Sequence, residues 1–317
     1  MSIPTSRLML RPVQLRLVQE IALHGQLQLA AEAVGMTQPA ASRTLAEIER
    51  LFGAPLFVRQ PKGMIPTEIG LSVLRRAQVI LRELRNMATD VEALRSGYAG
   101  SVSVGAVTGP AVSDLIPAIR EVKETAPDAD ITVDVMPSRD LLPRLMSGEM
   151  DFVLARILPD YDSGDFDIIP MRDERVLFIV RNAHPLARAP SVTLTELSDS
   201  EWILQQRGAP IREATVMAFA RFGLPEPRNV VNSPSMLLSI AYLAQTDAVA
   251  PVSEEVASLL IAPPVSGGFT ILNMPHEIRV SPYYLLSRKR HPLNPLALRL
   301  RERLILRSQQ AAQGLLS

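Results

Sequence analysis

Apolar residues in the first part of the chain recur at helical spacing. Val13, Leu17 and Ile21 lie four residues apart, which predicts a helix from about Pro12 to His24 that Gly25 ends. A short second helix is expected over 28–34. A third helix follows Thr37, and its core positions recur at steps of four, three and four: Ala41, Leu45, Ile48 and Phe52.

Polar residues occupy the opposite side of this third helix, at its N-terminal end. This is the position from which the second helix of a helix-turn-helix contacts base edges. Gln38 can pair with adenine, and Arg43 can reach guanine or phosphate. Each residue alone could be an ordinary solvated side chain, but their shared face favours DNA. The candidate contacts are Gln28, Thr37, Gln38, Pro39, Ser42 and Arg43.

A small basic hairpin is expected after Gly53. The segments 55–58 and 64–66 read as short strands, and residues 59–63 form the tip between them. Arg59 and Lys62 at this tip would contact the DNA backbone or minor groove and supply salt-dependent affinity. A basic hairpin that follows a helix-turn-helix is a wing.

A long helix is predicted from Glu68 to Arg95, with Thr67 as its N-cap. Its apolar residues recur at alternating steps of four and three, which is a heptad seam. The seam consists of Val73, Ala77, Ile80, Leu84, Met87, Val91 and Leu94. Such a seam needs a partner, and the simplest partner is the same helix of a second subunit, so we expect a homodimer.

From Ser101 onward, short apolar strands alternate with helices. This rhythm predicts parallel sheets with helices on their faces. The first set comprises strands at 101–107, 131–136 and 151–155 and helices at 111–125 and 141–147. The second comprises strands at 176–180, 201–204, 229–232 and 248–250, helices at 212–222 and 235–244, and a return through 271 and 283–287 to a last helix at 294–307. Two such lobes, joined by two crossing segments, would place a cleft between them.

Ligands of open α/β sheets bind beyond the carboxyl ends of parallel strands. Applied to the expected strands, this rule selects eight effector-binding candidates: Thr108, Gly109, Ser138, Arg139, Arg156, Gln206, Arg207 and Ser233. An arginine that faces the cleft would favour an anionic effector such as a carboxylate. Each arginine alone is also a candidate for a surface salt bridge.

The run LAAEAVGMTQPAASRTLAEIERLFGAPLFVRQPKGMIPTEIG at 29–70 resembles the signature of LysR-type transcriptional regulators. The AA pair, the TQPA core, the PLF-x-R wing and the T-x-x-G helix start follow one another at the family's spacings. GEMDFVL at 148–154 and HPL at 184–186 look like further landmarks of the same family. The resemblance implies an α/β multidomain protein: a winged helix-turn-helix, a long linker helix and a two-lobed effector domain like a periplasmic binding protein.

The same resemblance implies a regulator that binds a pseudo-palindromic promoter site on double-stranded DNA, contacts RNA polymerase and responds to a small-molecule effector. Homodimer and homotetramer both remain open, and no cofactor is implied. The expected domains are the winged helix-turn-helix at 1–67, the linker helix at 68–97, the effector domain at 98–307 and a flexible tail at 308–317. Lobe I would take 100–170 and 276–307, and lobe II would take 171–275.

Composition agrees with a globular protein, because 47% of the 317 residues are hydrophobic and 21% are charged. No stretch approaches the roughly 20 apolar residues of a membrane span, so we expect a cytoplasmic protein without a membrane partner. The net charge of zero hides an asymmetry. The first 100 residues hold 12 basic and 8 acidic side chains, and the remainder is acidic by the same margin.

Catalysis is not expected. The chain has no cysteine, no hydrolase, nucleotide-binding or zinc-protease motif, and its four histidines lack the spacing of metal ligands. We therefore predict no catalytic residue and no metal site. A two-lobed solute-binding protein is the competing class, and it is disfavoured by the DNA-binding head. A helix-turn-helix protein with a ligandless second domain remains an alternative.

Overall fold

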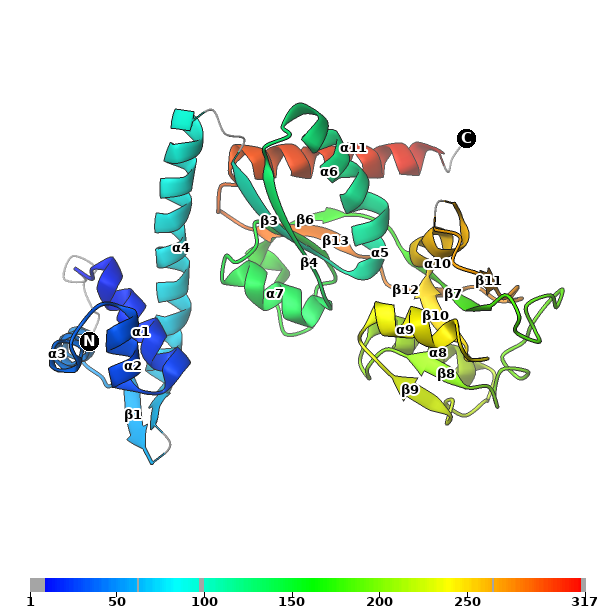
Figure 1. The fold of residues 1–317 in the computed structure, drawn as a ribbon, viewed down its shortest axis with the longest axis horizontal. Coiled ribbons are helices and arrows are strands. Elements are labelled where there is room, and N and C mark those ends of the chain that lie inside the picture. The colour runs from blue at the N-terminus through cyan, green and yellow to red at the C-terminus, as the bar shows by residue number, and fades with distance from the viewer. Residues whose placement is uncertain (1–8, 62, 97–99, 264, 315–317) are drawn as a thin grey trace. The chain divides into compact units, whose positions relative to one another are not determined.

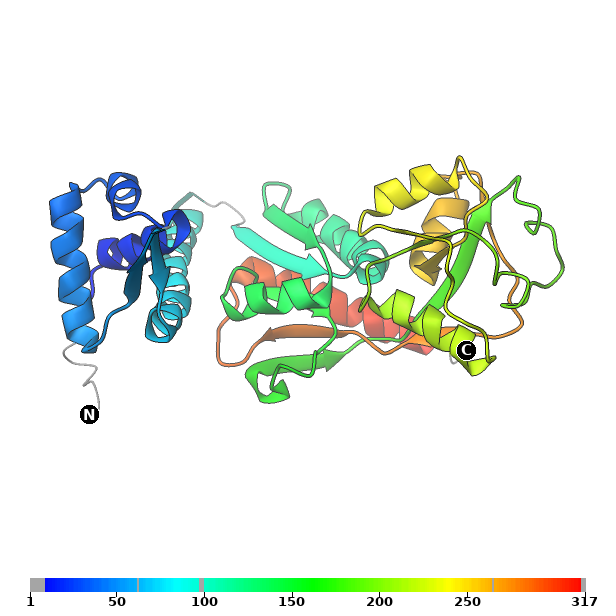
Figure 2. The same ribbon diagram turned by 90° about the horizontal axis from the view of Figure 1, so that it is seen from below.

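The structure is a computed structural model, and it describes residues 9–61, 63–96, 100–263 and 265–314. The chain divides into two compact units, which are Met1–Gly100 with Met146–Glu149, and Ser101–Leu145 with Met150–Ser317. Figures 1 and 2 show the helices and strands of each unit from two directions.

Three short helices form the core of the first unit. They are α1 (Pro12–His24), α2 (Leu27–Ala33) and α3 (Gln38–Phe52). Gly25 and Gly53 end α1 and α3 in the left-handed conformation, at φ values of 65° and 69°. The apolar stripes meet in one core, in which Leu17, Ile21 and Ile48 are fully buried. The helices predicted from the spacing are therefore confirmed to within one residue.

The wing is held against these helices by specific hydrogen bonds. It consists of β1 (Phe57–Gln60) and β2 (Gly63–Pro66), paired antiparallel. The Glu49 carboxylate on α3 accepts the Leu56 amide at 2.8 Å, and the Met64 amide donates to the Gly25 carbonyl at 2.7 Å. Arg59 lies in β1, opposite Met64, so its expected place in the hairpin tip is wrong. The strands extend further than the apolar residues alone suggest.

The long helix α4 (Glu68–Ser96) begins as predicted. Thr67 caps it, because its hydroxyl accepts the Gly70 amide at 3.0 Å and donates to the Pro55 carbonyl at 2.8 Å. A Cβ on Gly70 would lie 2.0 Å from the Leu56 carbonyl oxygen. The T-x-x-G pattern therefore has two physical causes: one residue caps the helix, and the other lets the wing approach it closely.

Lobe I of the second unit is built on a five-stranded sheet of order β4-β3-β5-β13-β6. The strands are β3 (Ser101–Ala106), β4 (Asp130–Val135), β5 (Phe152–Ala155), β6 (Phe166–Pro170) and β13 (Tyr284–Arg288), and the short helix η3 (Ser163–Asp165) precedes β6. As predicted, β3 pairs parallel with β4 and β5. In contrast, β13 pairs antiparallel with β5 and β6, and β6 was missed.

Helices cover both faces of this sheet. They are the consecutive segments α5 (Thr108–Pro110), η2 (Ala111–Leu115) and α6 (Ile116–Thr125), then α7 (Ser138–Met146) and α11 (Pro295–Gly314). In Figure 1, α6 and α11 lie together on one face and α7 lies on the other. The helices expected at 111–125 and 141–147 begin three residues earlier, at Thr108 and Ser138. Pro110 is compatible with the earlier start at Thr108, because proline is tolerated in a first turn. The last helix extends beyond its expected end at Arg307, because α11 continues to Gly314.

Lobe II is organised around β7, whose neighbours β10, β11 and β12 all pair antiparallel with it. The remaining strands β8 and β9 pair parallel with each other. The strands are β7 (Glu174–Arg181), β8 (Trp202–Leu204), β9 (Val230–Asn232), β10 (Ala250–Ser253), β11 (Phe269–Ile271) and β12 (Ile278–Val280). Within the described part of lobe II, the expected parallel arrangement holds for β8 with β9, and a single parallel bridge joins Trp202 to Val249.

Alternate residues of β7 face two separate cores. On one face, Phe178 packs with Trp202 at a ring distance of 5.1 Å, and Trp202 packs in turn with Phe219 at 5.5 Å. Ile179 packs on the other face. The helices that cover these faces are α8 (Pro210–Arg221), α9 (Met236–Leu243) and α10 (Glu254–Ile261), of which α10 was missed.

Two crossing segments connect the lobes, and they run side by side. The Met171 amide donates to the Tyr283 carbonyl at 3.2 Å, and the Tyr283 amide donates to the Arg172 carbonyl at 3.3 Å. Because β12 pairs with β7, residues 276–280 belong to lobe II. The return to lobe I therefore occurs at 281–283 and not at 276 as expected.

Candidate functional sites

A cleft of about 280 Å³ lies where the lobes of the second unit meet. It is lined by Val107, Thr108, Gly109, Val135, Met136, Pro137, Ser138, Arg139, Asp140, Arg156, Glu174, Gln205, Gln206, Ala209, Pro210, Ile211 and Pro234. The first turns of three helical segments, at 108–110, 138–140 and 210–211, contribute to this lining. Free backbone amides and a positive helix end favour anions at such positions.

Six of the eight predicted effector residues meet in this lining: Thr108, Gly109, Ser138, Arg139, Arg156 and Gln206. The other two do not line the cleft. Arg207 is 81% exposed and lies 3.8 Å from Glu226. Ser233 is buried, and its hydroxyl accepts the Ser235 amide at 3.1 Å, so it closes its own loop. Their assignment to the pocket is not supported by this geometry.

Arg156 makes a buried ion pair inside the cleft. Its guanidinium contacts the Glu174 carboxylate, and the two side chains are only 8% and 3% exposed. Its Nε donates to the Ser281 carbonyl at 2.9 Å, and its backbone amide donates to the Ser138 hydroxyl at 3.0 Å. The charge of Arg156 is therefore already neutralised by a residue of the protein.

Glu174 was not predicted, because it begins a strand and does not follow one. The residue stands at the first position of β7, beside the crossing into lobe II. A Cβ on Gly109 would lie 2.1 Å from its carboxylate oxygen, so the glycine makes room for Glu174. The pair joins two residues that lie in different lobes and are 18 positions apart in the sequence, so no local sequence pattern indicates it.

Arg139 is the cation of the cleft that stays available. It is exposed at the start of α7, and no described acidic side chain pairs with it. Its Nη1 lies 3.9 Å from the position that a Cβ on Gly208 would take. A side chain of lobe I thus reaches the loop of lobe II that carries Gln205 and Gln206.

That loop is fixed by a buried arginine. Arg212, which is 3% exposed, donates to the Gln205 carbonyl at 3.0 Å and to the Glu226 carboxylate at 2.9 Å. The hydrogen bond from Arg212 lowers the pKa of Glu226. The amide side chains at 205 and 206 are therefore presented on a rigid support.

A second charged cluster links the lobes beside the cleft. The Tyr283 hydroxyl donates to Asp114 at 2.7 Å, and Arg172 lies 3.3 Å from Asp114 and 3.8 Å from Glu255. Burial, together with the Asp114 charge, raises the pKa of Tyr283 well above its ordinary range. Burial also raises the pKa of Glu255, and the charge of Glu174 adds to this effect.

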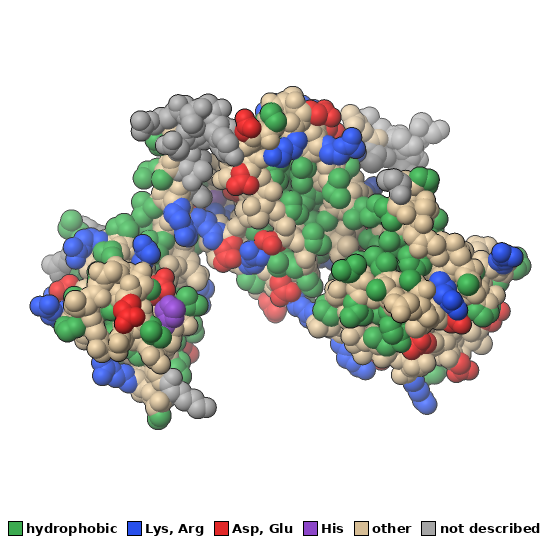
Figure 3. Space-filling model, viewed as in Figure 1, with side chains coloured by type: hydrophobic (Ala, Val, Ile, Leu, Met, Phe, Trp, Pro, Cys, Tyr) green, Lys and Arg blue, Asp and Glu red, His purple; other side chains and the backbone are tan. Residues whose placement is uncertain are grey.

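The predicted DNA-contacting residues are exposed on the first unit. Gln28, Thr37, Gln38, Pro39, Ser42, Arg43 and Arg59 all reach solvent, whereas Lys62 lies outside the described residues. Within the described chain, no acidic side chain pairs with Arg43 or Arg59. Figure 3 shows basic side chains, in blue, on the visible face of this unit. Their role in DNA contact stays a prediction.

The heptad seam of α4 is divided by the structure. Ala77 is 1% exposed and packs with Leu15 and Leu81, so it is already used within the chain. Val73 is half-buried against the helix-turn-helix core. Four seam residues remain exposed by 37–59%, namely Ile80, Leu84, Met87 and Val91, and the Leu94 side chain lies outside the described residues.

Neither a membrane span nor a metal site is found among the residues that the structure describes. No described helix combines the length and the apolar character that crossing a bilayer requires. Likewise, the described histidine and acidic side chains form no group of three that could hold a metal ion.

A winged helix-turn-helix together with a two-lobed α/β unit that contains a cleft is the domain composition of a transcriptional regulator with an effector-binding domain. Comparison with family models agrees. Residues 12–71 match the model described as bacterial regulatory helix-turn-helix protein, lysR family, and residues 95–307 match the LysR substrate binding domain. The chain belongs to the LysR family of DNA-binding transcriptional regulators.

Relatives in this family cover most of the chain. The regulator GbpR of Rhizobium radiobacter is 41% identical over 78% of this chain and 82% of its own length. GbpR of Azospirillum brasilense is 34% identical over 92% of this chain and 84% of its own length. The fold is similar to that of the LysR family regulator CbnR in the crystal structure of its complex with target DNA. The TM-score is 0.68 at 21% identity, and the match covers 94% of this chain and 100% of that chain.

Proposed function

We propose that the protein binds a promoter site through its winged helix-turn-helix and changes its activity when a small anionic metabolite enters the cleft. The observation that carries the second half is the cleft's charge pattern. Arg139 is unpaired among the described residues and stands among three helix N-terminal turns, whereas Arg156 is neutralised by Glu174. A cleft of about 280 Å³ suits a ligand of few atoms.

The proposed roles in the cleft follow from what each side chain can still offer. Arg139 would bind the anionic group, as a charge-assisted pair. Thr108 and Gln206 would donate or accept hydrogen bonds from the rest of the ligand. Ligand contacts from both lobes would favour one angle between them, and this change would pass to the bound DNA and to RNA polymerase.

Binding of small carboxylates tests the effector proposal. Isothermal titration of the full-length protein with a panel of metabolite carboxylates should find at least one ligand. Arg139→Met should weaken it about 10- to 100-fold, the size expected for a hydrogen bond to a charged group. Arg207→Met is the matched control, because Arg207 is exposed outside the cleft, and it should have no effect. Unchanged binding in Arg139→Met would contradict the assignment.

For the DNA half, we propose that two subunits pair through α4 and present two copies of the face formed by Gln38 and Arg43 to a pseudo-palindromic site. The support is the row of exposed apolar residues from Ile80 to Val91. A cytoplasmic location follows from this role. Homodimers and homotetramers would both use this seam.

The oligomeric state tests the seam. Leu84→Asp places a charge in it and should shift the full-length protein toward monomers in sedimentation velocity, with weaker binding to a two-half-site operator. Leu51→Asp is the matched control, since Leu51 is comparably exposed on α3 but outside the seam. A Leu84→Asp protein that remained fully associated at micromolar concentration would overturn the proposed interface.

A further inference from the structure

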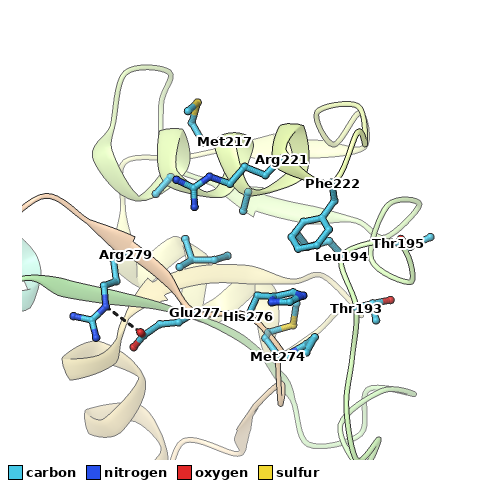
Figure 4. Close-up of a pocket in the computed structure, with 14 residues that line it drawn as sticks. Thr193, Leu194, Thr195, Met217, Arg221, Phe222, Met274, His276, Glu277 and Arg279 are labelled. Carbon is cyan, nitrogen blue, oxygen red and sulfur yellow. Dashed lines mark hydrogen bonds and ion pairs between the residues drawn. The ribbon is translucent and has the colours of Figure 1, made fainter.

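Lobe II contains a second cavity that shares no lining residue with the cleft. Its volume is about 620 Å³, and it lies between the C-terminal half of α8, the loop at 193–195 and the segment 274–279. Figure 4 shows side chains from all three segments around it. We call it the α8 pocket. Its size falls within the range of roughly 300–1,000 Å³ that is usual for small-molecule sites.

The floor and walls of the α8 pocket are mostly apolar. Leu194, Ala218 and Ile278 form a floor that is at most 9% exposed. Met217 and Phe222 are left 59% and 50% exposed, which is high for large apolar side chains. A ligand that covered them would remove apolar surface from water, and this is the main favourable contribution to small-molecule binding.

One end of the pocket is aromatic. The rings of Phe222 and His276 lie 4.8 Å apart at an angle of 32°, and Figure 4 shows them next to each other beside Leu194. Met274 is close by in the same view and supplies a polarisable thioether. Aromatic rings and methionine sulfur both favour contact with a further aromatic ring.

The charged residues of the pocket leave one cation in excess. Glu277 is engaged by Arg279, at 3.0 Å, and by Arg175. The hydrogen bond from Arg279 lowers the pKa of Glu277, so this carboxylate stays ionised and paired. Arg221 projects from the end of α8 over the cavity (Figure 4), and no described acidic side chain pairs with it. Its guanidinium is free to bind an anion.

We propose that the α8 pocket binds a small aromatic carboxylate, with its ring against Phe222 and His276 and its carboxylate on Arg221. This assigns the protein a second ligand site, and the assignment does not depend on the function of the cleft. The pocket wall includes β12, which runs directly into the crossing segment at 281–283. A ligand in the pocket would therefore contact the strand that leads to the connection between the lobes.

Fluorine NMR of the full-length protein with 4-fluorophenylacetate tests this proposal. The probe has the proposed ring and carboxylate, and 4-fluorophenylacetamide is its neutral counterpart. At millimolar concentration the carboxylate should show line broadening that saturates with added protein. The affinity of the amide should be lower by a factor of about ten or more, because the amide cannot form the charge-assisted pair with Arg221. Absence of saturable binding by the carboxylate would overturn the proposal.

Two variants locate the bound probe. Arg221→Met keeps the aliphatic stem and removes the charge, and it should weaken probe binding about tenfold or more. Arg221 is exposed at a helix end, so this variant should fold normally, which thermal unfolding checks. Arg139→Met alters the cleft and should leave probe binding unchanged. If Arg139→Met abolished binding while Arg221→Met did not, the probe would occupy the cleft and the α8 pocket would not be its site.

Discussion

The arginines of the proposed DNA face in the first unit and the buried arginine of the cleft in the second unit are used in opposite ways. In the first unit, Arg43 and Arg59 are exposed, and no described acidic residue pairs with them. In the second unit, Arg156 and Glu174 are buried in the cleft and neutralise each other. An unpaired surface cation is available for an external anion such as DNA phosphate. A buried pair instead makes each partner necessary for the other.

The largest effect is expected when one partner of the buried pair Arg156–Glu174 is removed. Glu174→Leu removes the acid and leaves the Arg156 guanidinium buried without its counterion. Loss of one partner of a buried pair typically costs about 3–5 kcal/mol, so the effector unit should unfold at a clearly lower temperature. Differential scanning calorimetry of the full-length protein measures this change.

A double variant separates the lost pair from the lost side chain. Arg156→Met with Glu174→Leu replaces both charges by apolar groups of similar volume, and much of the stability should return. If the double variant were as unstable as the sum of the two single variants, the two charges would not be coupled, and the instability of Glu174→Leu would not come from the charge left behind. The contrast between the two units would then be weaker than we infer.

The exposed arginines of the first unit should show the reverse behaviour. Arg43→Ala should cost about 1–3 kcal/mol of operator binding and relax the base preference, while the unfolding temperature stays the same. Arg59→Ala should weaken binding to all sequences and reduce the slope of affinity against salt concentration by about 1. Fluorescence anisotropy with operator and unrelated duplexes at several salt concentrations measures both. Equal operator affinity in both variants and the original protein would refute the assigned DNA face.

How far the sequence predicts each unit depends on the range of the contacts involved. The helices of the first unit follow from the spacing of apolar residues and from the residues that begin and end helices, because residues such as Leu17 and Ile21 meet neighbours close in sequence. The same holds for the cap formed by Thr67. The seam was predicted too long, since burial of Ala77 by α1 depends on how two separate helices pack.

In the second unit, the strand-end rule placed six of its eight candidates in the cleft because it concerns local loops. It could not find Glu174, whose role arises from a pairing between lobes. The rule also selected Ser233 and Arg207, which do not line the cleft, because it says where a loop lies and not where its side chains point. The α8 pocket was missed for a related reason, since its Phe222 and His276 are 54 positions apart and meet only after folding.

The smallest effect concerns Glu255, which shares the lobe junction with Glu174 and Arg172. Burial raises the pKa of Glu255 above its ordinary value of 4.5, so the folded state favours its protonated form. Below the pKa of Glu255 in the unfolded chain, the carboxyl is protonated in both states and burial costs no stability. As the pH rises from there through the higher pKa of the folded state, the free energy of unfolding falls. Glu255→Gln removes the ionisation. It should therefore match the original protein at acidic pH and be slightly more stable at neutral and alkaline pH.

The difference should be about 1 kcal/mol or less, because the Glu255 side chain keeps 15% exposure and Arg172, 3.8 Å away, offsets part of the cost of burial. Thermal unfolding of both proteins from acidic to alkaline pH measures it. Glu254→Gln, on the same helix but in an exposed pair with Arg175, is the control and should show no gain at alkaline pH. A Glu255→Gln protein that lost stability as the pH rose would mean that Arg172 outweighs burial. The acids at the lobe junction would then stabilise the fold by their charge, as Glu174 does.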